Sequence, residues 1–476
     1  MIVFLWHLDN ARQAQRGALI GWVFATSWLT STFWWLFVAM HTYAGLAAWL
    51  AILAVIALAA VLAIYYAIAS AAYVAFAPAN RVAACILFAS LWMLAELARG
   101  VWFTGFGWGA IGYAHVDLLG RAASFVGAYG VGALVAAIAF LTMAGLRSKR
   151  PRNAVGYLVL SGSLAALMAG APSGFTRSAG SIRVALLQGN IAQDEKFLPG
   201  SGVPDALQWY AQQLAIDHAP LTVAPETAIP LLPQQLPAGY WEHLQQQARL
   251  EGRALLLGVP LGSEAAGYTN SVVGFAPTDE STSSRAIYRY DKHHLVPFGE
   301  FIPPLFRWFT QMMNIPLGDF NRGTVGQASF AWQGQLLAPN ICYEDLFGEE
   351  LGARFANPAA APTIFVNVSN IGWFGNTVAI DQHLNISRMR VLEFDRPFIR
   401  ATNTGSTAII DHQARVTHTL PRLTRGVLVG EVEGRHGVTP FAWWVSRWGL
   451  WPLWLTGSTV VLLAFLLRPT APRPRG

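Results

Sequence analysis

The chain has 476 residues, of which 54% are hydrophobic and only 12% are charged, with a formal net charge of +6. Soluble domains carry about 25% charged residues, so this composition excludes an ordinary soluble protein and indicates an integral membrane protein. Two cysteines, Cys85 in an apolar run and Cys342 in a more polar region, are too few for a disulfide framework.

Six apolar segments are long enough to cross a bilayer, which takes about 20 residues of helix. They are residues 18–40, 45–76, 82–98, 123–146, 154–172 and 449–467. The first of them is too long for a cleavable signal peptide. Charged residues are scarce from about 18 to 172 and ordinary from about 180 to 440. We therefore predict a transmembrane region of about five spans in residues 1–175, a folded domain in 176–440, and a C-terminal transmembrane helix with a basic tail in 441–476.

Basic residues indicate which span ends face the cytoplasm, because Lys and Arg collect in short cytoplasmic loops. Arg12 and Arg16 precede the first span, Arg81 lies between the second and third, and a basic cluster occupies residues 147–152. The C-terminal tail holds three more arginines, whereas the loop between the first two spans has none. This pattern predicts that the folded domain lies outside the cytoplasm, and it accounts for the positive charge without a nucleic-acid partner.

Two apolar stretches outside the spans each leave two interpretations open. The loop 99–122 is rich in glycine and aromatic residues, which indicates an interfacial aromatic belt or, less favoured, a re-entrant surface that holds lipid chains. Glu96 and Arg99, three residues apart near a helix end, are expected to form a structural pair. Residues 303–318 are apolar and Met-rich, and they form either part of the core or a flexible arm on the bilayer surface.

The folded domain is predicted to alternate between strands and helices. Expected strands are 181–187, 221–224, 254–261, 270–275, 284–290, 335–341, 363–368, 399–412 and 424–432, and expected helices are 204–218, 240–252 and 377–395. This alternation predicts an α/β sandwich, in which ligands sit beyond the carboxyl ends of the strands. Glu226, Cys342 and Asn370 each lie at such an end.

Cys342 is the candidate nucleophile, although most free cysteines are simply small buried hydrophobic residues. A thiol reacts as its thiolate, so it needs a base or a positive neighbour. Glu226, at the end of an apolar strand, suits the base, and Lys292 suits the group that lowers the thiol pKa and stabilises an oxyanion. Each residue alone is more often structural, and their joint occurrence carries the hypothesis. His293 and His294 are alternative partners for a Cys-His pair.

Longer motifs around these residues resemble the bacterial apolipoprotein N-acyltransferases of the nitrilase (carbon–nitrogen hydrolase) superfamily. They are Gln188–Ile191, Pro225–Pro230, Lys292–Glu300 and Cys342–Glu344, together with Arg99-Gly100 and Thr104–Phe106 in the membrane loop. The resemblance covers nearly the whole chain. Motifs of this kind in a domain flanked by spans on both sides make the resemblance specific.

The resemblance implies a four-layer αββα nitrilase-like sandwich attached to a transmembrane helical bundle, with the domain on the periplasmic face of the bacterial inner membrane. It implies that the protein moves an acyl chain from a phospholipid, through a cysteine thioester, to the N-terminal amine of a diacylglyceryl-cysteine lipoprotein. The expected partners are this phospholipid donor, this lipoprotein acceptor and the membrane. No nucleic acid, cofactor or metal is expected, and we expect a monomer.

The same resemblance implies residue roles. Cys342 is the nucleophile, Glu226 the base, and Lys292 the group that stabilises tetrahedral intermediates together with the backbone N–H of Tyr343. Supporting and substrate-binding residues are Glu300, Tyr343, Glu344, Phe197 and Trp373. The chain departs from the family pattern in three places: Phe197 stands where Trp is typical, the turn Ser369–Phe374 differs slightly, and six spans are present where eight are usual.

Two other functions compete with this hypothesis. A membrane-tethered amidase or nitrilase would use the same three residues, with water as the acceptor. A scaffold or transport protein would not need Glu226, Lys292 and Cys342. Charged residues within the spans would support transport, but only Glu96 lies in one, near its end. The sequence contains no metal-ligand spacing, phosphate loop or dinucleotide fingerprint.

Overall fold

A computed structural model describes the chain except for residues 217–218, 251, 278–286, 303–318 and 468–476. The stretch 303–318, predicted to be either part of the core or an arm on the bilayer surface, therefore lies outside the described residues. The chain divides into two compact units. The first consists of Met1–Phe37, Ala47–Ser173 and Trp448–Gly476, and the second of Val38–Leu46 and Gly174–Arg447.

The first unit is helical. Its helices include α1 (Ile2–Asp9), α2 (Ala14–Thr32), α4 (Ala48–Phe76), α5 (Arg81–Val101), α6 (Ala123–Arg147), α7 (Pro151–Ala169) and α14 (Trp451–Leu466). Within the described residues, three helical stretches are long and apolar enough to cross a membrane: Ala48–Phe76, Arg81–Thr104 and Gly120–Arg147. The number is up to five if each of two bent pairs counts as a single span: α2 with Leu36–Tyr43, bent by 64°, and α13 (Pro440–Trp448) with α14, bent by 87°.

Two of the expected spans look different in the structure. The expected span 154–172 forms α7, which is not among these stretches, since Arg152 and Asn153 make its first turn polar. The expected span 18–40 is broken after Thr32, and residues 38–46 belong to the second compact unit. Apolar composition alone indicates how long a segment is, but not where its helix breaks.

Glu96 and Arg99 hold the backbone of the following loop. The N–H of Ile111 donates to Glu96 Oε1 at 2.8 Å. Arg99 Nη1 donates to the carbonyls of Phe106 and Trp108 at 2.6 and 2.7 Å. The charges of Glu96 and Arg99 also act on each other, as expected for a structural pair, although the hydrogen bonds given above go to the loop backbone. Buried backbone carbonyls need hydrogen-bond donors, and Arg99 supplies them to the loop.

The second unit contains two six-stranded sheets within the described residues. The first has the order β12-β1-β2-β3-β4-β5 and the second the order β11-β10-β9-β8-β7-β6. The first sheet comprises β1 (Thr176–Gln188), β2 (Leu221–Val223), β3 (Ala254–Ser263), β4 (Gly267–Phe275), β5 (Tyr288–Asp291) and β12 (Gly426–Gly437). The second comprises β6 (Phe330–Trp332), β7 (Gln335–Ile341), β8 (Ile364–Ser369), β9 (Phe398–Thr402), β10 (Ala408–Ile410) and β11 (Val416–Thr419). Strands β1–β3 and β7–β9 are parallel, and the outer strands are antiparallel.

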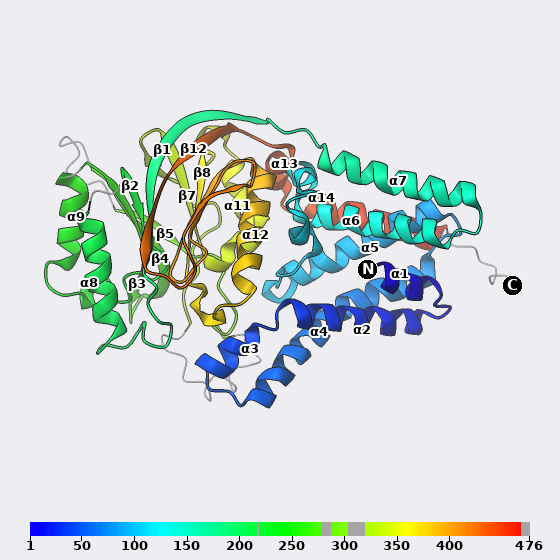
Figure 1. The fold of residues 1–476 in the computed structure, drawn as a ribbon, viewed down its shortest axis with the longest axis horizontal. Coiled ribbons are helices and arrows are strands. Elements are labelled where there is room, and N and C mark those ends of the chain that lie inside the picture. The colour runs from blue at the N-terminus through cyan, green and yellow to red at the C-terminus, as the bar shows by residue number, and fades with distance from the viewer. Residues whose placement is uncertain (217–218, 251, 278–286, 303–318, 468–476) are drawn as a thin grey trace. The chain divides into compact units, whose positions relative to one another are not determined.

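The sheets pack face to face between two helical layers, which is the expected αββα sandwich (Figure 1). Side chains of both sheets, including Val184, Leu256 and Ile364, form one buried core cluster. The other face of the first sheet packs against α8 (Gly202–Ala215) and α9 (Tyr240–Leu250). The second sheet is covered by α12 (Ala379–Phe394) and α11 (Gly348–Gly352) (Figure 1). Strands buried on both faces are apolar almost throughout, as parallel strands generally are.

A substitution at Leu256 tests the packing of the core between the sheets, because this side chain is fully buried there. We expect Leu256→Ala to lower the free energy of unfolding by about 2–5 kcal/mol, because it removes buried apolar surface and leaves a cavity. Heat-induced unfolding of the purified protein, followed by tryptophan fluorescence, measures the effect. Leu250→Ala is the control, because Leu250 is 77% exposed. Equal losses in the two variants would contradict the packing described.

Candidate active site

Polar residues that follow four strands come together at the carboxyl ends of the two sheets. Glu226 follows β2, Lys292 follows β5, Cys342 follows β7 and Asn370 follows β8. The backbone N–H of Asn370 donates to Glu226 Oε2 at 2.8 Å, so the loops after β2 and β8 are directly bonded. Parallel strands bring residues distant in sequence to one edge, where α/β proteins bind ligands.

Glu226 and Lys292 form a buried ion pair. Lys292 Nζ lies 3.3 Å from Glu226 Oε1, and the two residues are 1% and 7% exposed. The same ammonium lies 2.9 Å from both carboxylate oxygens of Glu300. Lys292 thus lies between two carboxylates, which offsets the cost of burying its charge. The structure thus brings Glu300, which the sequence predicts as a supporting residue, into direct contact with Lys292.

Asn270, in β4, connects the two carboxylates. Its Nδ2 donates to Glu226 Oε1 and to Glu300 Oε1, both at 2.7 Å. Its backbone carbonyl accepts from the N–H of Lys292 at 2.8 Å. Sequence reasoning missed this residue. The only signal was a polar run, Thr269–Ser271, in an otherwise apolar strand.

The electrostatic environment keeps Glu226 ionised. Burial alone raises its pKa, but the charges of Lys292 and Lys196 outweigh burial and lower the pKa below its ordinary value. Hydrogen bonds from Asn270 and Asn370 act in the same direction. Burial also disfavours the charged form of Lys292, yet Glu300 and Glu226 raise its pKa. At neutral pH both members of the pair are charged.

Cys342 sits on a strained backbone immediately after β7. Its φ of +52° is left-handed, a region that non-glycine residues seldom adopt and that often marks functional sites. Its carbonyl accepts from Asn367 Nδ2 at 3.1 Å and lies 3.2 Å from His383 Nε2, contacts that hold this turn. Burial and the charge of Glu226 raise the pKa of the Cys342 thiol, while Lys292 partly opposes them. The resting thiol is therefore protonated.

Glu344 connects the turn that contains Cys342 to the loop that contains Lys292. It accepts from Ile341 N and from the Tyr290 hydroxyl, at 2.7 and 2.8 Å. Its other oxygen accepts from the N–H groups of His293 and His294, at 2.7 and 3.2 Å. Both histidine rings have other partners: His293 Nδ1 lies 2.7 Å from the Gly323 carbonyl. His294 Nδ1 lies 2.9 Å from Glu350. The geometry thus favours Glu226 over a histidine as the partner of Cys342.

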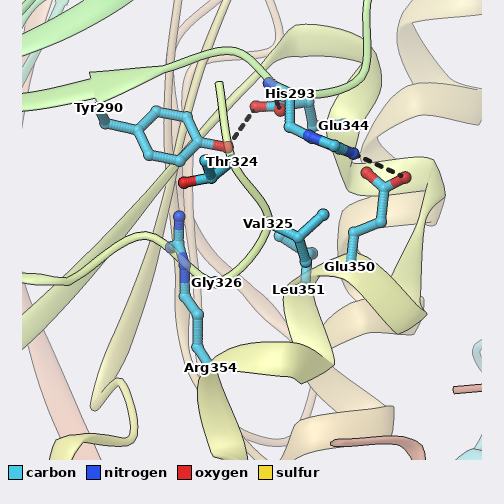
Figure 2. Close-up of a pocket in the computed structure, with 9 residues that line it drawn as sticks. All are labelled: Tyr290, His293, Thr324, Val325, Gly326, Glu344, Glu350, Leu351 and Arg354. Atoms are coloured by element: carbon cyan, nitrogen blue, oxygen red, sulfur yellow. Dashed lines mark hydrogen bonds and ion pairs between the residues drawn. The ribbon is translucent and has the colours of Figure 1, made fainter. Parts of the chain in front are cut away.

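A small cavity adjoins Glu344 on the side of Tyr290, His293 and Glu350 (Figure 2). Figure 2 shows the Tyr290 hydroxyl bonded to Glu344 and His293 facing Glu350. The cavity has a volume of about 10 Å³, which suffices for about one water molecule. Cys342 and Glu226 do not line it. It is therefore not a substrate site.

The remaining predicted residues surround this centre. The Tyr343 ring is buried and lies 5.3 Å from that of Phe347. Phe197 and Trp373 are 36% and 41% exposed. The Trp373 ring lies 5.8 Å from that of Tyr43, in the stretch Val38–Leu46 of the same compact unit, a contact that sequence reasoning did not predict. Partly exposed aromatic rings of this kind suit contact with an apolar ligand.

Lys196 was also missed from the sequence. It lies in the loop after β1, is 2% exposed, and donates from Nζ to the backbone carbonyl of Glu226 at 3.0 Å. Burial lowers its pKa to about 8, although Glu226 and Cys342 act to raise it. Nearby, Gln193 Oε1 accepts from Asn370 Nδ2 at 2.7 Å, so this loop is bonded to two of the strand ends.

Comparison with known proteins assigns both parts of the chain. Residues 1–141 match the family model "Apolipoprotein N-acyltransferase N-terminal domain", and residues 183–439 match "Carbon-nitrogen hydrolase". A protein of Verminephrobacter eiseniae named "Apolipoprotein N-acyltransferase" is 56% identical over 94% of this chain and 87% of its own length. The chain belongs to the apolipoprotein N-acyltransferase family. A family member from Ralstonia nicotianae is 42% identical over 96% of this chain and 86% of its own length.

Similarity to solved structures is weaker. A carbon-nitrogen hydrolase from Helicobacter pylori is 17% identical, covers 61% of this chain and 99% of its own, and gives a TM-score of 0.39. An amidase from Nesterenkonia sp. is 17% identical, covers 60% of this chain and 100% of its own, and gives a TM-score of 0.39.

Asn270 offers a test of the carboxylate network. We expect Asn270→Ala to raise the pKa of Glu226, because it removes a hydrogen bond that favours the ionised carboxylate. The acidic limb of the pH–rate profile should therefore move to higher pH, and the rate at neutral pH should fall about tenfold or more. Steady-state assays across pH measure both effects. Asn357→Ala, at an exposed asparagine, is the control. An unshifted acidic limb would show that Asn270 does not set the state of Glu226.

Proposed function

We propose that the protein is an apolipoprotein N-acyltransferase that moves an acyl chain from a phospholipid to the N-terminal amine of a diacylglyceryl-cysteine lipoprotein. The observation that carries the proposal is the buried Glu226–Lys292 ion pair, whose charges both act on the Cys342 thiol, in a chain of this family. The amidase alternative is not favoured, because the relatives are named as acyltransferases and the N-terminal family model also matches.

In the proposed first half-reaction, Cys342 attacks the ester carbonyl carbon of the phospholipid while its thiol proton passes to Glu226. Lys292, with the backbone N–H of Tyr343, stabilises the negative charge that develops on the carbonyl oxygen. The carbon–oxygen bond then breaks, and the leaving alcohol oxygen takes the proton from Glu226. The products are an acyl thioester on Cys342 and a lysophospholipid.

In the second half-reaction the lipoprotein amine attacks the thioester carbon, and Glu226 takes a proton from the amine nitrogen. The carbon–sulfur bond breaks, and the sulfur regains a proton from Glu226. Both steps therefore use one base and one oxyanion site. Because the resting pKa of Glu226 is lowered and that of the thiol is raised, proton transfer is coupled to formation of the new bond to carbon.

The supporting residues hold Cys342, Glu226 and Lys292 in position. Glu300 and Asn270 fix the Lys292 ammonium and the Glu226 carboxylate. Glu344 fixes the backbone on either side of the nucleophile turn. Phe197 and Trp373, as exposed aromatic residues, would contact the acyl chains of the substrates.

We further propose that the protein is a multi-pass monomer of the bacterial inner membrane with its catalytic domain in the periplasm. Apolar helices support the membrane location, and the distribution of basic residues supports the orientation. The proposed domains are a transmembrane region in 1–175, a catalytic domain in 176–440 and a C-terminal helix and tail in 441–476.

Cys342 is the decisive residue for the mechanism. Purified enzyme incubated with phospholipid should gain the mass of one acyl chain on the peptide that contains Cys342. We expect Cys342→Ala to abolish this adduct and the transfer, and Cys342→Ser to trap little or none, while both proteins still fold and insert. Mass spectrometry of the digested protein locates the adduct.

Cys85→Ala is the matched control, because Cys85 is the only other cysteine in the sequence. This variant should keep the full adduct. An adduct on another peptide, or none under turnover conditions, would refute the thioester mechanism.

A further inference from the structure

Lysine is rare in this chain, and the structure gathers it at one place. Of the 32 basic residues only three are lysines: Lys149, Lys196 and Lys292. Lys149 is exposed, whereas Lys196 and Lys292 are 2% and 1% exposed and both lie beside Glu226. Arginine carries positive charge elsewhere in the chain. An ammonium differs from a guanidinium because it is compact and readily shifts its pKa on burial.

The contacts of Lys196 place a second positive charge at the catalytic centre. Its Nζ donates to the Glu226 backbone carbonyl at 3.0 Å, and both the Glu226 carboxylate and the Cys342 sulfur lie close enough to act on its charge. No carboxylate within the described residues forms an ion pair with it. A buried ammonium that lacks such a partner is costly, so a structural role alone does not explain it.

The charge balance of the site shows what this ammonium changes. Lys292 lies between Glu226 and Glu300, so these three residues together carry one net negative charge. Ionising Cys342 or forming an oxyanion there would add a second negative charge in a buried environment. Lys196 brings the sum of the charges on Lys292, Glu226, Glu300 and itself to zero.

We propose that Lys196 is a positioning residue of the acyl transfer, which holds the main chain of Glu226 and offsets the negative charge that arises when Cys342 gives up its proton. The inference rests on the proposed function, since it takes Glu226 as the base and Cys342 as the nucleophile. It adds a second cation to the charged groups on which that mechanism depends.

The role of Lys196 has a pH signature. Its pKa of about 8 means that the residue is charged at neutral pH and loses its charge as pH rises through about 8. Glu226 and Cys342 are the titratable groups that act on the charge of Lys196, and Asp194 and Glu195 lie exposed on its own loop. The other charged groups at the packed strand ends are Lys292, Glu300, Glu344, Asp345 and Arg400. The electrostatic contribution of Lys196 to the rate is therefore present below pH 8 and is lost above it, whereas its hydrogen bond to the Glu226 carbonyl does not depend on the charge.

The test compares wild type with Lys196→Met, which keeps an unbranched side chain one atom shorter and removes the charge and the hydrogen-bond donor. Single-turnover acylation of the full-length enzyme by phospholipid is measured from pH 6 to 9.5. We expect wild type to be about 10- to 100-fold faster at pH 6.5. Above pH 9 the ratio of rates should fall to a smaller, constant value, because the neutral amine loses its charge but still donates to the Glu226 carbonyl, which Met cannot do. Lys149→Met, at the exposed lysine, should match wild type throughout.

Three outcomes would overturn the inference. One is a ratio that stays constant with pH, because a packing defect does not titrate. Another is a higher KM for phospholipid with unchanged kcat, which would make Lys196 a substrate-binding cation. The third comes from Lys196→Arg, whose charge persists across this pH range. That variant should lose the decline in rate above pH 8, and retention of the wild-type decline would count against the proposal.

Alkylation of Cys342 by iodoacetamide separates this inference from the proposed function. The reaction needs no lipid and reports the fraction of thiolate. At pH 7, Lys196→Met should be alkylated about 10-fold more slowly than wild type, as located on the Cys342 peptide by mass spectrometry. If phospholipid leaves no acyl adduct on wild type, the proposed function fails, yet the alkylation rates still test Lys196. Equal rates would refute its electrostatic role.

Discussion

The buried ammonium of Lys292 is the constraint on which the catalytic domain depends. A charge of this kind is tolerated in a protein interior only when opposite charges and hydrogen bonds surround it. Glu226 and Glu300 supply the charges, and Asn270 holds both carboxylates in place. The partners come from different strands and loops, so the ammonium is satisfied only when the first sheet is assembled around it.

Glu344 extends this dependence to the second sheet. One carboxylate accepts from groups next to the nucleophile and from groups next to the lysine, so the ends of β7 and β5 are joined by short bonds. The apolar core between the sheets fixes their spacing, and the hydrogen bonds at the strand ends fix the register of the reactive atoms. A catalytic centre held in this way is supported by rigid strands rather than by loops alone, which favours accurate geometry.

The sequence allowed much of the sandwich and the main polar residues to be predicted, because both depend on local patterns. Apolar strands that end in Glu226 and Cys342 are visible as short hydrophobic runs followed by polar residues. Asn270 and Lys196 could not be found in this way, because their importance arises from partners distant in sequence. The helix break after Thr32 and the hydrogen bonds from Arg99 to the loop carbonyls depend on packing and on backbone geometry. Hydropathy describes neither.

The protonated state of the resting Cys342 sulfur has a consequence for its chemical exposure. Thiolates attack peroxides and disulfides far more readily than neutral thiols do. In the proposed mechanism the Cys342 sulfur ionises only as it reacts with an ester, so it would resist oxidation between turnovers. The same property bears on inhibitor design. Under the proposed mechanism, simple electrophiles that require a preformed thiolate would label Cys342 slowly, whereas acylating compounds that bind the proposed oxyanion site would be activated by the enzyme itself.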